Sequence, residues 1–134
     1  MKKTLILTPI LMAIVALAGC DKTTHLNDPS SEGARLSAEE FYNLLITGKT
    51  TEYVANMQNA ATMDSSMHHQ MNDLMLQFLD EEQHLRGGIV SAAATSDTTT
   101  DSTTIVVMEL KYGNGTKESI TLPLIFTQGR WYIK

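Results

Sequence analysis

The chain is poor in several residue types that would narrow its function. Of 134 residues, one is cysteine and three are proline, and 19% are charged. A single cysteine excludes an intramolecular disulfide framework and any multi-cysteine metal site. The formal net charge is −5, and an acidic chain lacks the positive patch on which nucleic-acid binding depends. No phosphate loop, nucleophile elbow or zinc signature is present, so we expect no cofactor, no metal and no nucleic-acid partner.

The first twenty residues have the features of a cleaved export signal. Lys2 and Lys3 precede an apolar run over residues 5–18. As a helix this run would cover about 21 Å, which is shorter than the ~30 Å hydrocarbon core of a bilayer. The run ends in Leu17-Ala18-Gly19-Cys20, which resembles the bacterial lipobox. The resemblance implies that residues 1–19 are a lipoprotein signal peptide and that Cys20 is lipidated. An ordinary secretory signal with a chance cysteine is the alternative.

Lipidation at Cys20 would fix the location of the protein. Two or more acyl chains hold a protein on a bilayer without a transmembrane helix. The lipobox resemblance therefore implies a protein of the bacterial cell envelope whose first partner is the membrane itself. Asp21 follows the cysteine. In enteric bacteria an aspartate at this position resembles the signal that retains lipoproteins in the inner membrane, which favours that membrane where the rule applies.

The mature chain divides into a tether and one domain. Residues 20–35 contain one large apolar side chain, Leu26, and are too polar to build a core, so we expect a lipidated N-terminus and a flexible tether. A domain over residues 36–134 follows. Ser37 and Glu40 form a capping box at the start of its first helix. Two further helices are predicted near 51–58 and 64–86.

The second half of the domain has the pattern of an antiparallel sheet. Strands are predicted at 89–95, 103–112, 119–126 and 131–133, with a polar loop over 96–102. Pro123 predicts a bulge or an edge position in the third strand. The fold class is therefore α+β, with three N-terminal helices on a curved four-stranded meander. We expect the sheet to be covered by the methionine-rich stripe of the third helix.

This element order resembles the cone-shaped fold of the nuclear transport factor 2-like (NTF2-like, cystatin-like) proteins. The resemblance covers residues 36–134 and includes the closing sequence Gly129-Arg130-Trp131-Tyr132-Ile133. Small bacterial lipoproteins of uncharacterised function are common on this fold. The fold alone does not fix a function, because it carries isomerases, dehydratases, transport adaptors and inert assembly modules.

Candidate site residues follow from placing the helices over such a cone. Six side chains could line its cavity: Tyr42, Tyr53, His68, Met71, Met75 and Trp131. We expect a non-catalytic module that binds a protein or small-molecule ligand. A small isomerase, dehydratase or hydrolase that uses His68 and a tyrosine is one alternative. The other is a Cu(I)-binding protein with methionine and histidine ligands, because His68 and His69 lie among Met63, Met67, Met71 and Met75. Methionines four residues apart are also typical of a core stripe, which we favour.

Overall fold

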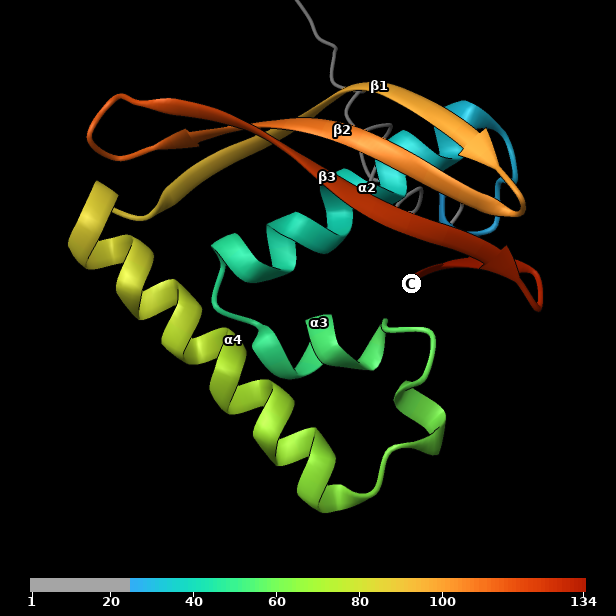
Figure 1. Cartoon of the computed structure of the whole chain (residues 1–134), viewed down its shortest axis with the longest axis horizontal. Coiled ribbons are helices and arrows are strands. Elements are labelled where there is room, and N and C mark those ends of the chain that lie inside the picture. Colours follow the sequence, from blue (N-terminus) through green and yellow to red (C-terminus); the bar gives the residue numbers. More distant parts are fainter. Residues whose placement is uncertain (1–24) are drawn as a thin grey trace, which may run out of the picture.

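The computed structural model describes residues 25–134, so the predicted signal peptide, Cys20 and Asp21 lie outside the described part (Figure 1). Its helices are α2 (Ser31–Ile46), α3 (Thr50–Ala55), the short 3-10 helix η2 (Ala60–Thr62) and α4 (Ser65–Arg86). Its strands are β1 (Ile89–Thr100), β2 (Thr103–Tyr112), β3 (Lys117–Thr127) and β4 (Arg130–Ile133). The strands form one antiparallel sheet in the order β1-β2-β3-β4. The α+β meander predicted from the sequence is confirmed.

Helix α2 begins earlier than the capping box indicated. Its N-cap is Ser30, whose hydroxyl accepts a hydrogen bond from the Gly33 amide. Ser37 is not a cap but a fully buried residue in the middle of the helix. The capping-box prediction was wrong because Ala34, Ser37 and Ala38 are small enough to pack against other parts of the chain, and this burial outweighs a cap preference worth about 1 kcal/mol.

The end of the predicted tether is packed onto the domain. Leu26 lies against the core, and the Ser37 hydroxyl donates to the His25 carbonyl at 3.1 Å. The indole Nε1 of Trp131 donates to the Asp28 carbonyl at 2.6 Å. The expectation of a flexible tether that reaches to residue 35 is therefore wrong from His25 onward. Side-chain hydrogen bonds to α2 and to Trp131 near the far end of the chain hold a segment whose own composition is too polar to build a core.

The core lies between α2 and the inner face of the sheet. Alternate residues of β2 are buried, among them Val106, Met108 and Leu110, and Phe41 and Leu45 of α2 are buried with them. In Figure 1, α2 runs beneath β1 and β2, whereas α4 runs obliquely away from the sheet. The prediction that α4 covers the sheet was wrong, because the small residues of α2 allow it to pack closest.

Much of α4 is consequently exposed. The exposed fractions are 44% for Met67, 53% for Leu74, 47% for Leu76 and 73% for Leu85, and Glu82 is its only buried residue. The helix starts at the N-cap Asp64, which accepts from the Met67 amide, and ends at Gly87 in the left-handed conformation. The apolar stripe that the sequence assigns to a core is therefore divided: Met75 and Phe78 pack against the core, whereas Met67, Leu74 and Leu85 lie at the surface.

Strand β1 forms one edge of the sheet and is longer than predicted. It continues to Thr100, and a two-residue turn with positive φ at Asp101 and Ser102 replaces the expected loop. Its ladder with β2 shifts register near Ile89 and again near Ala94. The Ala94 amide donates to the Glu39 carboxylate of α2 at 2.8 Å, so a side chain occupies this backbone donor.

Pro123 lies opposite Ile105 in the ladder between β2 and β3. Its carbonyl accepts from the Lys134 amide, which places the imide nitrogen on the β4 side of the strand. No hydrogen bond to β2 is lost there. The predicted bulge or edge position was wrong, because β3 lies between β2 and β4 and its ladder with β2 is regular at Pro123. The proline is tolerated there because its missing donor faces the end of β4, whose last paired residue, Ile133, lies opposite Leu124.

Candidate functional site

The three aromatic candidates belong to the core and not to an open cavity. Tyr42, Tyr53 and Trp131 are each at most 9% exposed. Trp131 packs edge-on against Phe126, with ring centroids 5.2 Å apart. Burial raises the pKa of the Tyr42 and Tyr53 hydroxyls above the ordinary value, so both stay neutral at physiological pH. These residues stabilise the fold and do not line a pocket with the other candidates.

The remaining candidates are divided between different places along α4. The His68 Nε2 lies 2.9 Å from the Ala60 carbonyl, so a backbone group occupies the imidazole. Met75 packs against the core. Met71 lines an open pocket that lies nearer the N-terminus of α4 than Met75 does. The structure therefore does not join the six predicted residues in one cavity, because α4 lies away from the sheet.

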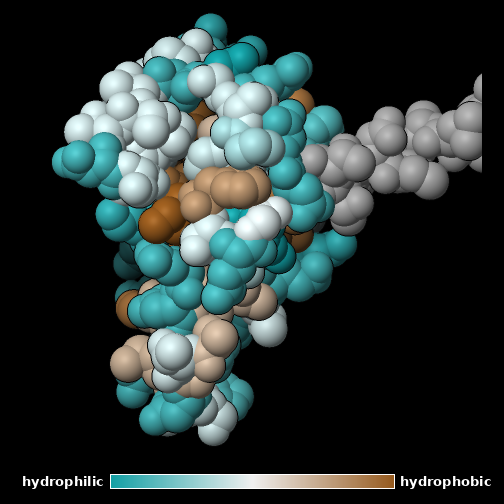
Figure 2. All heavy atoms as spheres, turned by 90° about the vertical axis from the view of Figure 1, so that its right-hand side faces the viewer, coloured by the Kyte–Doolittle hydropathy of each residue, from teal (hydrophilic) through white to brown (hydrophobic). Residues whose placement is uncertain are grey.

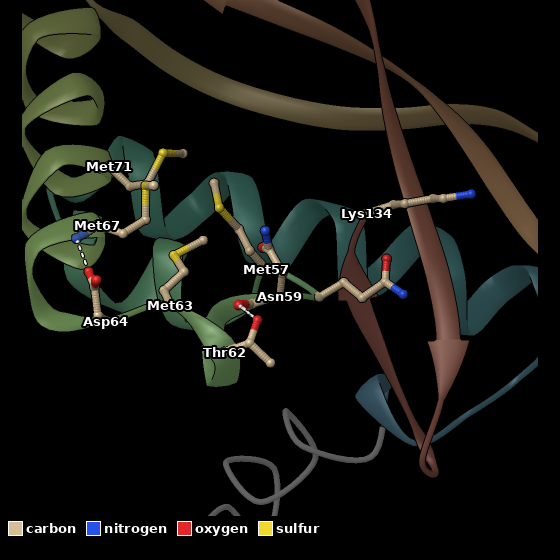
Figure 3. Close-up of a pocket in the computed structure, with 9 residues that line it drawn as sticks. Met57, Asn59, Thr62, Met63, Asp64, Met67, Met71 and Lys134 are labelled. Carbon is tan, nitrogen blue, oxygen red and sulfur yellow. Dashed lines mark hydrogen bonds between the residues drawn. The ribbon is translucent and has the colours of Figure 1, made fainter.

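Four methionines surround that open pocket, which we call the methionine pocket. Its volume is about 670 Å³. It is lined by Met57, Gln58, Asn59, Thr62, Met63, Asp64, Met67, Met71 and Lys134. In Figure 3 the side chains of Met57, Met63, Met67 and Met71 reach toward one another from three segments of the chain. Sequence spacing identified three of the four, whereas Met57, which the sequence assigned to a helix over 51–58, lies in the chain after α3.

The backbone beneath each methionine is held by hydrogen bonds. Met57 forms a parallel bridge with Ile133, and the next amide, of Gln58, donates to the Ile133 carbonyl at 2.6 Å. The Met63 amide donates to Ala60, and the Met67 amide donates to the N-cap Asp64 at 2.8 Å. The main chain of the pocket is therefore fixed, while each thioether keeps three rotatable bonds.

The surface near this pocket mixes apolar and polar groups. On the end of the molecule that carries the β3–β4 turn, apolar atoms reach the surface between polar side chains (Figure 2). Figure 3 shows the Lys134 ammonium directed away from the methionines, and it donates to the Thr103 hydroxyl at 2.6 Å. The Thr62 hydroxyl donates to the Asn59 carbonyl. The pocket therefore combines four thioethers with the polar side chains of Gln58, Asn59 and Asp64.

A polar cluster that sequence reasoning missed lies at the other end of α4. Arg86 forms two hydrogen bonds to Glu82, at 2.9 and 3.0 Å, and its guanidinium lies 3.8 Å from the ring centroid of Tyr112. The Tyr112 hydroxyl donates to Glu118 at 2.5 Å, which together with nearby Arg86 lowers the pKa of that carboxyl. Only the Glu82–Arg86 pair could have been recognised from the sequence, because its four-residue spacing is typical of an ion pair along a helix. The cluster joins α4 to the β2–β3 hairpin.

The described residues 25–134 show two absences that bear on metals and membranes. They contain no group of three or more His, Cys, Asp or Glu side chains placed to hold a metal ion. They also contain no helix long and apolar enough to cross a bilayer.

Comparison with known proteins places the fold. No family model and no curated protein matches the chain. A solved structure from Campylobacter jejuni, provisionally named an NTF2-like transpeptidase, superimposes with a TM-score of 0.58 and 11% identity. The match covers 72% of this chain and 92% of that one. The fold is therefore NTF2-like, as the element order predicted, and at this identity the likeness carries the fold alone.

Proposed function

We propose that the protein is a lipid-anchored envelope lipoprotein whose domain binds a ligand or partner through the methionine pocket without catalysing a reaction. The observation that carries the proposal is the exposure of thioethers in an open concavity, with Met67 44% exposed. Surface methionines are costly to leave in water and are typical of adaptable apolar binding sites. The lipobox at Leu17–Cys20 supplies the anchor.

The non-catalytic part of the proposal rests on the polar groups around the pocket. The Asp64 carboxylate caps α4, and the Thr62 hydroxyl donates to a backbone carbonyl. Nearby His68 is likewise occupied by the Ala60 carbonyl. No described side chain at the pocket forms a nucleophile–base pair with another, as covalent catalysis would require.

Dye binding tests the pocket directly. We would use the mature chain 20–134 with Cys20→Ser, which retains every described residue and removes the lipid and the thiol. An apolar fluorescent dye, 1-anilinonaphthalene-8-sulfonate, is titrated into this protein and into Met67→Glu. We expect about tenfold weaker binding in the variant, because burying one methionine side chain contributes roughly 1.5–3 kcal/mol.

Leu76→Glu provides the matched control. Leu76 lies on the same helix with a similar exposed fraction, 47%, but outside the pocket, and the substitution adds the same charge. It should leave dye binding unchanged. Equal binding by the parent protein and Met67→Glu, with circular dichroism showing both folded, would contradict the pocket. The anchor is tested separately: alkyne-palmitate should label the full chain in cells and should not label Cys20→Ala.

A further inference from the structure

We propose that the methionine pocket is a binding site for the soft monovalent ion Cu(I), held by the sulfurs of Met57, Met63, Met67 and Met71. The inference rests on the pocket of the proposed function and names its ligand. The four side chains come from the chain after α3, the link between η2 and α4, and the first turns of α4. In Figure 3 they reach toward a common space that is open to solvent.

Thioether chemistry selects this ion. A methionine sulfur is a soft, neutral ligand that prefers Cu(I), whereas Mg²⁺ and Ca²⁺ require oxygen ligands and Zn²⁺ prefers thiolate, imidazole or carboxylate. The described residues contain no cluster of His, Cys, Asp or Glu side chains that could hold such harder ions. The chain's one cysteine, Cys20, precedes the described residues, so no described thiol competes for the metal.

Packing alone does not account for the four methionines. A core methionine is enclosed, as Met108 is at 0% exposure, whereas Met67 is 44% exposed. Met57 packs against the core and also lines the open pocket with Met63, Met67 and Met71. Met75 continues the same helical spacing, yet it packs against the core and does not line the pocket. The structure thus separates a packing methionine from the pocket methionines on a single helix.

The site is also arranged to accept a cation. Asp64 lines the pocket and supplies a negative charge close to the sulfurs, while the Lys134 ammonium is drawn toward Thr103. The main chain at Met57, Met63 and Met67 is fixed by hydrogen bonds, so binding need order only the flexible side chains. Four thioethers can then enclose the ion by rotation about their side-chain bonds.

Methionine methyl NMR with Ag⁺ tests the site. Ag⁺ is soft, monovalent and inert to air, and it replaces Cu(I) as the first probe. Of the eight methionines in the chain, Met1 and Met12 precede Cys20 and are absent from the mature Cys20→Ser protein. We expect Ag⁺ to shift the methyl signals of the four pocket methionines and to leave Met75 and Met108 in place. Zn²⁺ should shift none of them.

Variants and a competition assay then measure the affinity. Met63→Leu/Met67→Leu keeps the apolar volume and removes two sulfurs. The affinity for Cu(I) is measured anaerobically in competition with bicinchoninate. We expect the double variant to lower it at least roughly 10- to 100-fold, because even the loss of a group that only supports a metal ligand has an effect of that size. Met75→Leu should retain the parent affinity.

The outcomes separate the ion from the pocket. If excess Ag⁺ shifts no methyl signal, or shifts Met75 and Met108 together with the others, the Cu(I) inference is overturned. Dye binding then decides independently whether the proposed binding function stands, because the leucine variant keeps an apolar pocket. Loss of both metal and dye binding in Met67→Glu, with only metal binding lost in Met63→Leu/Met67→Leu, supports both proposals.

Discussion

Trp131 shows how one side chain can order a distant segment. Its ring is buried in the core, while its Nε1 donates to the Asp28 carbonyl across more than a hundred residues of sequence. Buried indole nitrogens require a partner, and here the partner is backbone that has little apolar surface of its own. The sequence predicted Trp131 as an inward-facing residue but could not reveal this bond, because nothing local to residues 25–30 specifies it.

Trp131→Phe is therefore expected to free the N-terminal segment more than the core. Phenylalanine keeps most of the packing and removes the donor, so we expect a loss of about 1–3 kcal/mol in unfolding free energy by urea titration. Hydrogen exchange should accelerate for the amides of residues 25–30. Tyr132→Phe, at the adjacent half-buried residue, should change stability by less than about 0.5 kcal/mol. Unchanged exchange at 25–30 in Trp131→Phe would show that the indole bond does not order the segment.

Glu118 makes stability depend on pH in the acid range. The hydrogen bond from Tyr112, aided by Arg86, holds the pKa of this carboxyl below its ordinary value of 4.5 in the folded state. A carboxyl with a lowered folded pKa contributes stability above pH 4.5 and loses it as the pH falls toward the folded pKa. The stability difference between the parent protein and Glu118→Gln should therefore be largest near neutral pH and narrow below 4.5.

Urea unfolding at a series of pH values from neutral to acid measures that difference. Glu52→Gln, at an exposed carboxylate of α3, serves as the control and should follow the parent pH profile. A Glu118→Gln profile parallel to that of the parent would show that the contact with Tyr112 contributes nothing to folding.

The elements divide into those that local pattern determines and those that tertiary contacts determine. Helix α4, strand β2 and strand β4 match their predicted ranges closely, because caps, β-branched runs and glycine turns are local signals. The start of α2, the length of β1 and the partner of α4 do not. Each of these depends on a contact with residues distant in sequence. In β1, for example, Asp97 forms an ion pair with Arg35 of α2 at 2.5 Å, which stabilises the polar second half of the strand.

The candidate site was predictable only in part for the same reason. Helical spacing placed Met63, Met67, Met71 and Met75 on one face, but the interpretation of that face as core holds for Met75 and is wrong for the three that line the pocket. Whether a stripe is buried depends on which helix lies closest to the sheet, and α2 takes that position through its small residues. Met57 joins the pocket through its bridge to Ile133, a tertiary contact without a sequence signature.

The junction between α4 and the sheet depends on two glycines that touch. Gly87 has a φ of +81° at the helix C-terminus, and a Cβ there would lie 3.1 Å from the Gly113 Cα. Gly87→Ala combines that contact with the left-handed penalty of about 1–2 kcal/mol. We expect it to lower the unfolding free energy by more than Gly115→Ala does. Gly115 has a φ of +89° and open space around its added carbon.

The difference between the two glycine variants, by urea unfolding, isolates the contact between Gly87 and Gly113. Both variants pay a backbone cost, whereas only Gly87→Ala must push the β2–β3 hairpin away from α4. Equal losses would mean that the hairpin accommodates the added carbon without cost.

At the scale of the whole molecule, the docking of residues 25–30 restricts how the domain can sit on a bilayer. If Cys20 carries the lipid, about five residue steps separate it from His25, and these span at most ~17 Å. Asn27 donates to the Gly129 carbonyl in the β3–β4 turn at 2.9 Å. The β2–β3 hairpin lies at the far end of β3, which has 11 residues and a length of about 35 Å.

We therefore expect the β3–β4 turn to lie closer to the membrane than the β2–β3 hairpin. Bimane labels attached at Gln128→Cys and Asn114→Cys in the lipidated protein, on vesicles containing a headgroup-linked quencher, provide the measurement. Quenching should be stronger at position 128 than at 114. Equal quenching of the two labels would indicate a domain that tumbles freely on its anchor.

The occupied backbone donor on β1 has a consequence for a protein confined to a surface. Lipid attachment would concentrate copies of the protein in two dimensions. Exposed edge strands of neighbouring molecules then meet often and can pair with one another, which leads to aggregation. Strand β1 is a poor partner for such pairing. Its Ala94 amide already donates to the Glu39 carboxylate, and two register shifts make the strand irregular. Crowded molecules then come into contact without forming intermolecular β-sheets through β1.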